Sequence, residues 1–110
     1  MPNVKIYVDD RLYPGLKAAL DAALLPARNL LCSALGVEVP ACQFAVMPVL
    51  AMPDLPPINA ELHLLPRADR TRDRVTEVGL ALRALLGTAT GQHVAVRIAF
   101  LDPATYVALK

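Results

Sequence analysis

The first residues of the chain alternate between apolar and polar side chains. Over residues 3–9 this alternation has a period of two, which is typical of a β-strand with one buried face. Over residues 16–35 the apolar positions recur every three or four residues instead, and Gly36 follows, so we predict a helix that ends there. Pro26 lies inside this segment and is expected to kink the helix or to break it into two.

The same order of patterns returns after a turn-rich joint at residues 48–57, which contains four prolines at positions 48, 53, 56 and 57. A second strand is predicted before this joint, from Cys42 to Val49. Residues 59–64 then match residues 3–8 with a shift of 56, and the same shift places Arg67 on Arg11. The chain therefore contains two segments with the same order of predicted strands and helices.

The helical pattern of the second segment also matches that of the first. With a shift of 55, six apolar positions between residues 75 and 89 fall on apolar positions between residues 20 and 34, and Gly91 falls on Gly36. A final strand is predicted from Val94 to Phe100. We interpret the chain as a single domain over residues 1–110 with internal repeats at about 2–50 and 57–106; chance similarity between two amphipathic helices is the alternative.

Two β-α-β units predict an α+β fold with a four-stranded mixed sheet and both helices on one face, because such crossovers are right-handed and join parallel strands. The other face of the sheet is left without a helix. The chain is also 55% hydrophobic although it has only 110 residues, and a domain of this size exposes much of its surface. We therefore predict a homo-oligomer.

Composition argues against several classes of partner. Charged residues make up 19% of the chain, the net charge is +1 and aromatic residues are 5%, so neither nucleic acid nor a membrane is expected as a partner. No apolar run reaches the ~20 residues that span a bilayer, and the N-terminus does not resemble a signal peptide. Cys32 and Cys42 lack the spacing of a metal site, which fits a reduced cytoplasmic location. No metal is predicted, because His63 and His93 lie on different predicted strands and lack the spacing of metal ligands. No cofactor is predicted, because no phosphate-loop or dinucleotide motif is present.

Pro2 is the residue that most directly suggests chemistry. If Met1 is removed, Pro2 becomes a free secondary amine at the start of a buried strand, with its lone pair aimed by the backbone. Burial disfavours the ammonium form and moves the pKa of such an amine toward neutrality, as a general base requires. If Met1 is retained, the same nitrogen is a tertiary amide without basicity. Proline is also tolerated at the first position of a strand for purely structural reasons.

Three motifs carry a resemblance to a known family. They are the Met-Pro start, the sequence Arg-Thr-Arg-Asp-Arg at residues 70–74 before the second helix, and the tail at residues 106–110. Together with the repeated β-α-β order, they make the chain similar to the tautomerase superfamily, closest to its 5-carboxymethyl-2-hydroxymuconate isomerase branch. That branch commonly has an arginine near the start of the second strand, where this chain has Ala41, Cys42 and Gln43. A different enol or acid is therefore expected as substrate.

The resemblance implies a homotrimer with active sites between subunits, Pro2 as the catalytic residue and arginines that hold a substrate carboxylate. The predicted substrate-binding residues are Arg70, Arg72, Arg11, Tyr106 and Arg97. The alternative for the arginines is a purely structural role, in a solvated turn in which Asp69 and Asp73 pair with them. The alternative for Tyr106 is that it only packs the tail against the domain.

The sequence thus predicts a cofactor-free tautomerase or isomerase that moves a proton on an enol or unsaturated 2-oxo acid, with Pro2 as general base. Its class would be that of an intramolecular oxidoreductase, catalysing a keto-enol or C=C shift on a small carboxylate-bearing enol or keto compound. A hydratase-like variant would need a water-activating acid that the sequence does not identify. The alternative from a different class is a non-catalytic trimeric relative or a ferredoxin-like ligand-binding domain.

Overall fold

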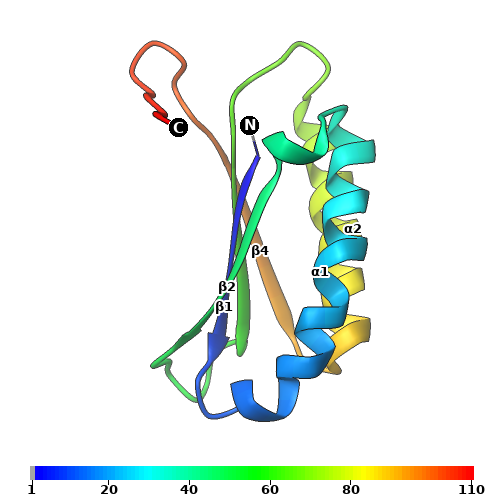
Figure 1. Ribbon diagram of the computed structural model, residues 1–110, viewed down its shortest axis with the longest axis vertical. Coiled ribbons are helices and arrows are strands. Elements are labelled where there is room, and N and C mark those ends of the chain that lie inside the picture. The colour runs from blue at the N-terminus through cyan, green and yellow to red at the C-terminus, as the bar shows by residue number, and fades with distance from the viewer. Residues whose placement is uncertain (1) are drawn as a thin grey trace.

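A computed structural model describes residues 2–110, so the predicted removal of Met1 lies outside the described residues. The strands are β1 (Asn3–Asp9), β2 (Gln43–Val49), β3 (Ile58–Leu64) and β4 (Val94–Phe100). The helices are α1 (Tyr13–Leu35) and α2 (Arg72–Thr90), with a short 3₁₀ turn, η1 (Val39–Ala41), before β2. Both helices lie side by side on one face of the sheet (Figure 1). The predicted α+β architecture is therefore confirmed.

The sheet has the strand order β2-β1-β3-β4. Each half supplies one parallel pair, β1 with β2 and β3 with β4. The two halves meet through the antiparallel pair β1–β3, in which Asn3 lies opposite His63 and Val8 opposite Ile58. The start of β1 and the end of β3 therefore lie at one end of the sheet, and β2 and β4 are its open edges.

The core lies between the sheet and the two helices. The alternating residues of β1 that were predicted to be buried are fully buried, and they pack with one stripe of each helix. The main helical core residues are Leu20, Leu31, Leu35, Val78, Leu82 and Leu86. Gly79 lets α2 approach β4 closely, since a Cβ at this position would lie 3.1 Å from the Cδ1 atom of Ile98.

α1 runs without a break through Pro26, so the expected division of this helix is wrong. Pro26 and Ala22, four residues earlier, are both exposed, so the carbonyl that loses its hydrogen bond lies on the solvent side of the helix. α1 also begins at Tyr13, earlier than predicted, because Pro14 occupies a first-turn position that needs no N–H group. Among the described residues, α1 alone is long and apolar enough to cross a membrane by length and composition, and one stripe of it packs on the sheet.

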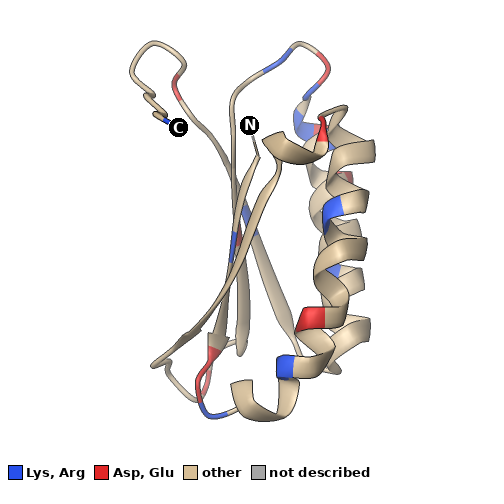
Figure 2. Ribbon diagram, viewed as in Figure 1, with Lys and Arg blue, Asp and Glu red and all other residues tan. Residues whose placement is uncertain are grey.

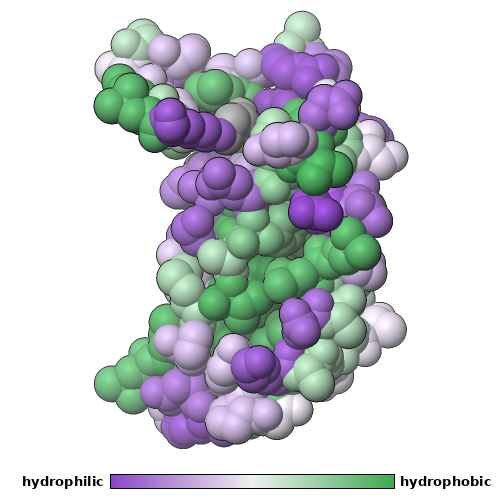
Figure 3. All heavy atoms as spheres, viewed as in Figure 1, coloured by the Kyte–Doolittle hydropathy of each residue, from purple (hydrophilic) through white to green (hydrophobic). Residues whose placement is uncertain are grey.

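The face of the sheet without helices is polar at its centre. Lys5 and Arg97 lie on the two sides of Glu61 in the strand register. Tyr7 donates a hydrogen bond to Glu61 at 3.4 Å, and Arg97 donates one to the side chain of Asn59 at 3.0 Å. The most exposed large apolar residues lie in the β2–β3 loop and in the tail, and less exposed ones lie on the helices and at the end of β4. Figure 3 shows hydrophobic surface at both ends of the molecule and across the middle of the viewed face.

Candidate active site

Pro2 is fully buried at the beginning of β1, beside a cavity of about 250 Å³. Its carbonyl oxygen accepts a hydrogen bond from the backbone N–H of Gln43 at 3.1 Å, which fixes it against the start of β2. The side of the cavity formed by the sheet consists of Pro2, Asn3 and Gln43. A proline held in this way has no side-chain freedom, so the backbone alone sets the direction of its nitrogen.

The opposite side of the cavity is the tail of the chain, residues 106–110. After β4 the chain turns at Asp102, whose carbonyl oxygen accepts hydrogen bonds from the backbone N–H groups of Thr105 at 3.1 Å and Tyr106 at 2.9 Å. The turn brings the tail back toward the start of β1, so that the two ends of the chain lie at the same end of the molecule (Figure 1). Tyr106 therefore faces the same cavity as Pro2, and these are the two predicted site residues that the structure brings together.

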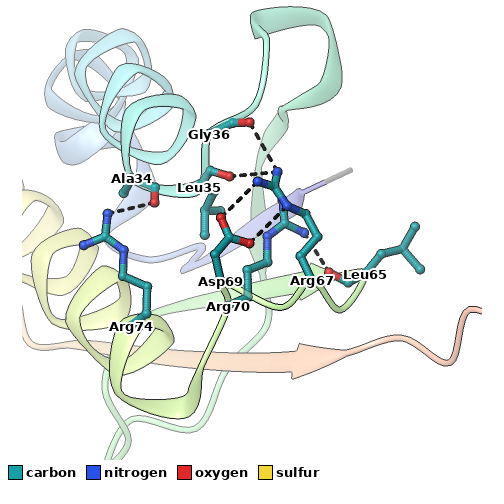
Figure 4. Close-up of polar contacts among 8 residues, drawn as sticks. All are labelled: Ala34, Leu35, Gly36, Leu65, Arg67, Asp69, Arg70 and Arg74. Atoms are coloured by element: carbon teal, nitrogen blue, oxygen red, sulfur yellow. Dashed lines mark hydrogen bonds and ion pairs between the residues drawn. The ribbon is translucent and has the colours of Figure 1, made fainter.

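The arginines before α2 and in its first turn lie at this end of the molecule as well (Figure 2), but several are engaged with backbone carbonyl groups. Arg67 donates to the carbonyl oxygens of Leu35 and Gly36, each at 3.3 Å, and pairs with Asp69 at 2.9 Å. Arg74 donates to the carbonyl oxygen of Ala34 at 3.0 Å (Figure 4). These guanidinium groups satisfy the carbonyls at the C-terminus of α1, where the helix dipole also favours positive charge.

Arg70 is buried and is 6% exposed. Its Nη1 atom donates a hydrogen bond to the carbonyl oxygen of Leu65 at 2.7 Å, which holds the loop between β3 and α2 closed. Its Nε atom has no hydrogen-bond partner among the described residues. Burial lowers the pKa of Arg70, and the neighbouring Arg67 lowers it further. The side chain thus has a structural contact, and it does not line the cavity beside Pro2.

The other three predicted arginines lie away from Pro2 within the chain. Arg72 lines a separate cavity of about 460 Å³ between α2 and β4. Arg97 lies in the middle of the sheet on the face without helices. Arg11 follows β1 at the opposite end of the sheet, where its Nε atom donates to Asp9 at 2.9 Å and holds the pKa of that carboxyl group below its usual range. None of them lines the Pro2 cavity of the described chain.

Six residues that line the cavity were not predicted as site residues, and three of them are polar or charged: Asn3, Gln43 and Lys110. Gln43 lies at the start of β2, where the isomerase branch commonly has an arginine. That departure from the family pattern was the one sequence signal that could have identified Gln43 as a cavity residue. Lys110 belongs to the tail that the resemblance included, but only the fold shows that the tail returns to Pro2. Among residues 2–110, no group of three His, Cys, Asp or Glu side chains is arranged to hold a metal ion.

The two cysteines lie beside each other near this end of the molecule. Cys42 is buried, and burial together with the neighbouring thiol of Cys32 raises the pKa of Cys42 to about 11. A thiol with such a pKa is protonated at neutral pH and is a poor nucleophile. Cys42 is therefore a packing residue of the core and not a second candidate for catalysis.

The sequence matches no known protein-family profile. It also matches no curated protein. Solved structures with the same fold are nevertheless similar over nearly the whole chain. Malonate semialdehyde decarboxylase is 16% identical, with a TM-score of 0.67 over 98% of this chain and 91% of the enzyme. A macrophage migration inhibitory factor-like protein from Entamoeba histolytica is 8% identical, with a TM-score of 0.73 over 97% and 94%.

A fused 4-OT symmetric trimer is 11% identical, with a TM-score of 0.76 over 96% of this chain and 92% of that one. These three proteins are members of the tautomerase superfamily. At identities this low the likeness concerns the arrangement of helices and strands and not the chemistry. The chain has the fold of the tautomerase superfamily.

Proposed function

We propose that this protein is a cofactor-free tautomerase or isomerase in which Pro2, after removal of Met1, is the general base. The observation that carries the proposal is the position of Pro2: it is fully buried, fixed by β2, and lies beside a cavity at one end of the sheet. Burial favours the neutral amine, which is the form that accepts a proton. One of the enzymes with this fold, malonate semialdehyde decarboxylase, has also been solved as a proline-to-alanine variant.

In the proposed reaction, the Pro2 nitrogen takes a proton from the enol oxygen or from the carbon next to a carbonyl group. It then returns the proton to another carbon of the same molecule, so no external oxidant or cofactor is needed. Negative charge develops on the enolate oxygen during the transfer. Tyr106, Asn3 and Gln43 line the cavity, and their phenol and side-chain amide groups are the hydrogen-bond donors that we propose for that oxygen.

The proposal includes a homotrimer in the cytoplasm. Two open sheet edges and the exposed apolar residues Leu50, Met52, Leu55, Val107 and Leu109 favour association. A trimer also offers a route by which Arg11 or Arg72 of one subunit reaches the Pro2 cavity of another. Free thiols at Cys32 and Cys42 fit a reducing compartment. Within the superfamily we place the protein nearest the 5-carboxymethyl-2-hydroxymuconate isomerase branch, with a different enol acid as substrate.

The second candidate function is a non-catalytic ligand-binding relative, and a specific observation favours it. Within the described chain no arginine lines the Pro2 cavity, and Arg67, Arg70 and Arg74 instead bind backbone carbonyl groups. A binding domain needs a cavity but no free amine. The state of residue 1 therefore separates the two candidates.

The test begins with the intact mass of the purified protein, which shows whether Met1 is removed. The processed protein is then assayed for ketonisation of phenylenolpyruvate. Pro2→Ala is expected to retain the fold, because the buried positions of β1 are Val4, Ile6 and Val8, and to lose about 10²- to 10⁴-fold in rate.

The control is a protein with an uncleavable residue before Pro2, which turns the nitrogen into an amide and leaves every side chain in place. Equal rates for the blocked and the processed proteins would eliminate proline catalysis. The ligand-binding candidate would then replace it.

A further inference from the structure

The two cysteines of the chain form a pair of contacting thiols that the proposed reaction does not use. Cys32 lies in the last turn of α1 and is partly exposed, whereas Cys42 directly precedes β2 and is buried. Their thiol groups share a hydrogen bond, and Cys32 packs against the hydrophobic core that contains Cys42. The chain has only these two cysteines, so each has the other as its one possible disulfide partner within the molecule.

The segment between the two cysteines is folded back by two turns. α1 ends at Gly36, which has a left-handed backbone with a φ of 64°, and the Cys32 carbonyl oxygen accepts hydrogen bonds from the N–H groups of Gly36 and Val37. The 3₁₀ turn η1 follows, in which the Val39 carbonyl oxygen accepts a hydrogen bond from the N–H group of Cys42 at 3.1 Å. Figure 1 shows η1 between the end of α1 and the start of β2, close to the N-terminus. The backbone therefore holds both cysteines in position, and their contact is a property of the fold.

The surroundings give the two thiols different parts in an exchange reaction. A dissolved reagent reaches Cys32 first, because Cys32 is partly exposed and Cys42 is only 5% exposed. Burial and the neighbouring Cys32 raise the pKa of Cys42 to about 11, while the positive charge of Arg28, one turn before Cys32 on α1, acts in the opposite direction. Cys42 is therefore a weak nucleophile toward reagents in solution, but it is in contact with any sulfur that becomes attached to Cys32.

We propose that Cys32 and Cys42 are a reversible dithiol–disulfide pair, which a small-molecule disulfide closes and an excess of small-molecule thiol opens. The Cys32 thiolate attacks one sulfur of the reagent, the S–S bond of the reagent breaks, and the first half leaves and takes up the proton that Cys32 has lost. The Cys42 thiolate then attacks the Sγ atom of Cys32, and the second half leaves and takes up the proton of Cys42. The protein loses two electrons and two protons, and the reagent gains them.

The new bond would tie the end of α1 to the start of β2, next to the residue that fixes Pro2. Gln43 follows Cys42 directly, and its N–H group donates the hydrogen bond of 3.1 Å to the Pro2 carbonyl oxygen. A change in the position of Cys42 is therefore passed to Pro2 through a single residue. The pairing itself does not depend on the reaction at Pro2, and it is measured without any substrate.

The experiment equilibrates the full chain with mixtures of oxidised and reduced glutathione, in buffer and in denaturing urea. The products are alkylated and their intact masses measured, since an internal disulfide lowers the mass by about 2 Da and blocks alkylation of both cysteines. Because the fold already brings the two thiols into contact, the equilibrium constant for the disulfide is expected to be about 10- to 100-fold larger in the native protein than in urea. The oxidised protein is expected to melt about 5–15 °C above the reduced protein at one fixed protein concentration.

Cys32→Ser and Cys42→Ala are the matched controls, because each retains one thiol and can only form a mixed disulfide with glutathione. In native buffer Cys42→Ala is expected to gain one glutathione at the partly exposed Cys32, and Cys32→Ser is expected to stay largely unmodified at the buried Cys42. Cys32→Ser changes a partly exposed side chain and is expected to keep the fold, which circular dichroism checks.

Three outcomes would each overturn the assignment. The first is an equilibrium constant in the native protein within about twofold of its value in urea, because the contact in the fold would then contribute nothing to the bond. The second is an unchanged chain that stops at the mixed disulfide with glutathione. The third is a disulfide between two copies of the chain, which a non-reducing gel detects. None of these outcomes depends on turnover, so loss of the proposed function would leave the result intact.

Discussion

Replacing Arg67 and Arg74 together by alanine should loosen the junction between the two halves of the chain. Both side chains come from the second half and bind carbonyl oxygens of the last turn of α1, which belongs to the first half (Figure 4). In the double variant, the carbonyls of Ala34, Leu35 and Gly36 lose these donors and must turn to water. The last turn of α1 also loses two positive charges that interact favourably with the helix dipole.

The magnitude follows from the geometry and exposure of the contacts. The two hydrogen bonds from Arg67 are long, at 3.3 Å, and the side chains of Arg67 and Arg74 are 45% and 46% exposed. Solvent screening therefore keeps each contribution near the 0.3–1 kcal/mol usual for a cation at a helix C-terminus, or about 0.6–2 kcal/mol for the pair. For a domain of this size, that corresponds to a fall in melting temperature of about 3–9 °C.

The assay is thermal unfolding followed by circular dichroism, at one fixed protein concentration because an oligomer melts in a concentration-dependent way. Arg83→Ala is the control, since Arg83 is an exposed arginine of α2 for which the described residues provide no hydrogen bond or ion pair. It is expected to shift the melting temperature by no more than about 2 °C. A double variant that melts within the range of this control would refute the capping role of the two arginines.

Three further predictions concern stability and reactivity. Gly79→Val should lower the free energy of unfolding in urea by about 1–3 kcal/mol, since its Cβ would crowd Ile98 and force α2 away from β4. The stabilisation from Asp9, whose pKa is lowered by Arg11, should be present above about pH 4 and lost as the pH falls through that lowered value. The melting temperatures of the unchanged protein and Asp9→Asn should therefore converge in acid, and a constant difference would contradict this. At about pH 8 a thiol reagent should label Cys42 slowly in the native Cys32→Ser variant and rapidly in urea, because burial raises the pKa of Cys42.

The sequence was sufficient for the sheet and both helices because each element has a single clear period. β4 begins and ends at the predicted residues, and β3 differs by one residue at its start. The errors concern the start of α1 and its expected division, because a proline predicts a helix break in the sequence but is tolerated at these two positions of the fold. Pro14 lies in the first turn of α1, and Pro26 faces solvent, so neither removes a buried hydrogen bond.

The candidate site was predictable only in part. Pro2 follows from its place before a buried strand, and it needs no knowledge of distant contacts. The arginines were harder. Arg70 binds the carbonyl group of Leu65, five residues earlier in the chain, and its neighbours Arg67 and Arg74 bind backbone carbonyl groups about 30 to 40 residues away, at the end of α1. A sequence pattern shows charges that lie near one another in the chain, such as Arg67 and Asp69, but not a helix terminus that comes close only after folding. The return of the tail to Pro2 could not be predicted either, because this contact joins the two ends of the chain and forms only on folding.

The antiparallel contact between β1 and β3 decides where the second half of the chain has its counterpart of Pro2. Under the shift that aligns β1 with β3, the counterpart of Pro2 is Ile58, and the strand register places it at the other end of the sheet, opposite Val8. The nitrogen of Ile58 is committed to a peptide bond with Pro57, so it carries no basic lone pair. Of the two halves of similar shape, only the first therefore has a backbone nitrogen that can become a free amine, at Pro2. The equivalent nitrogen, that of Ile58, is an amide. Cleaving the backbone before Ile58 would release a second amine there, a primary one, near Asp9 and at the end of the β2–β3 loop.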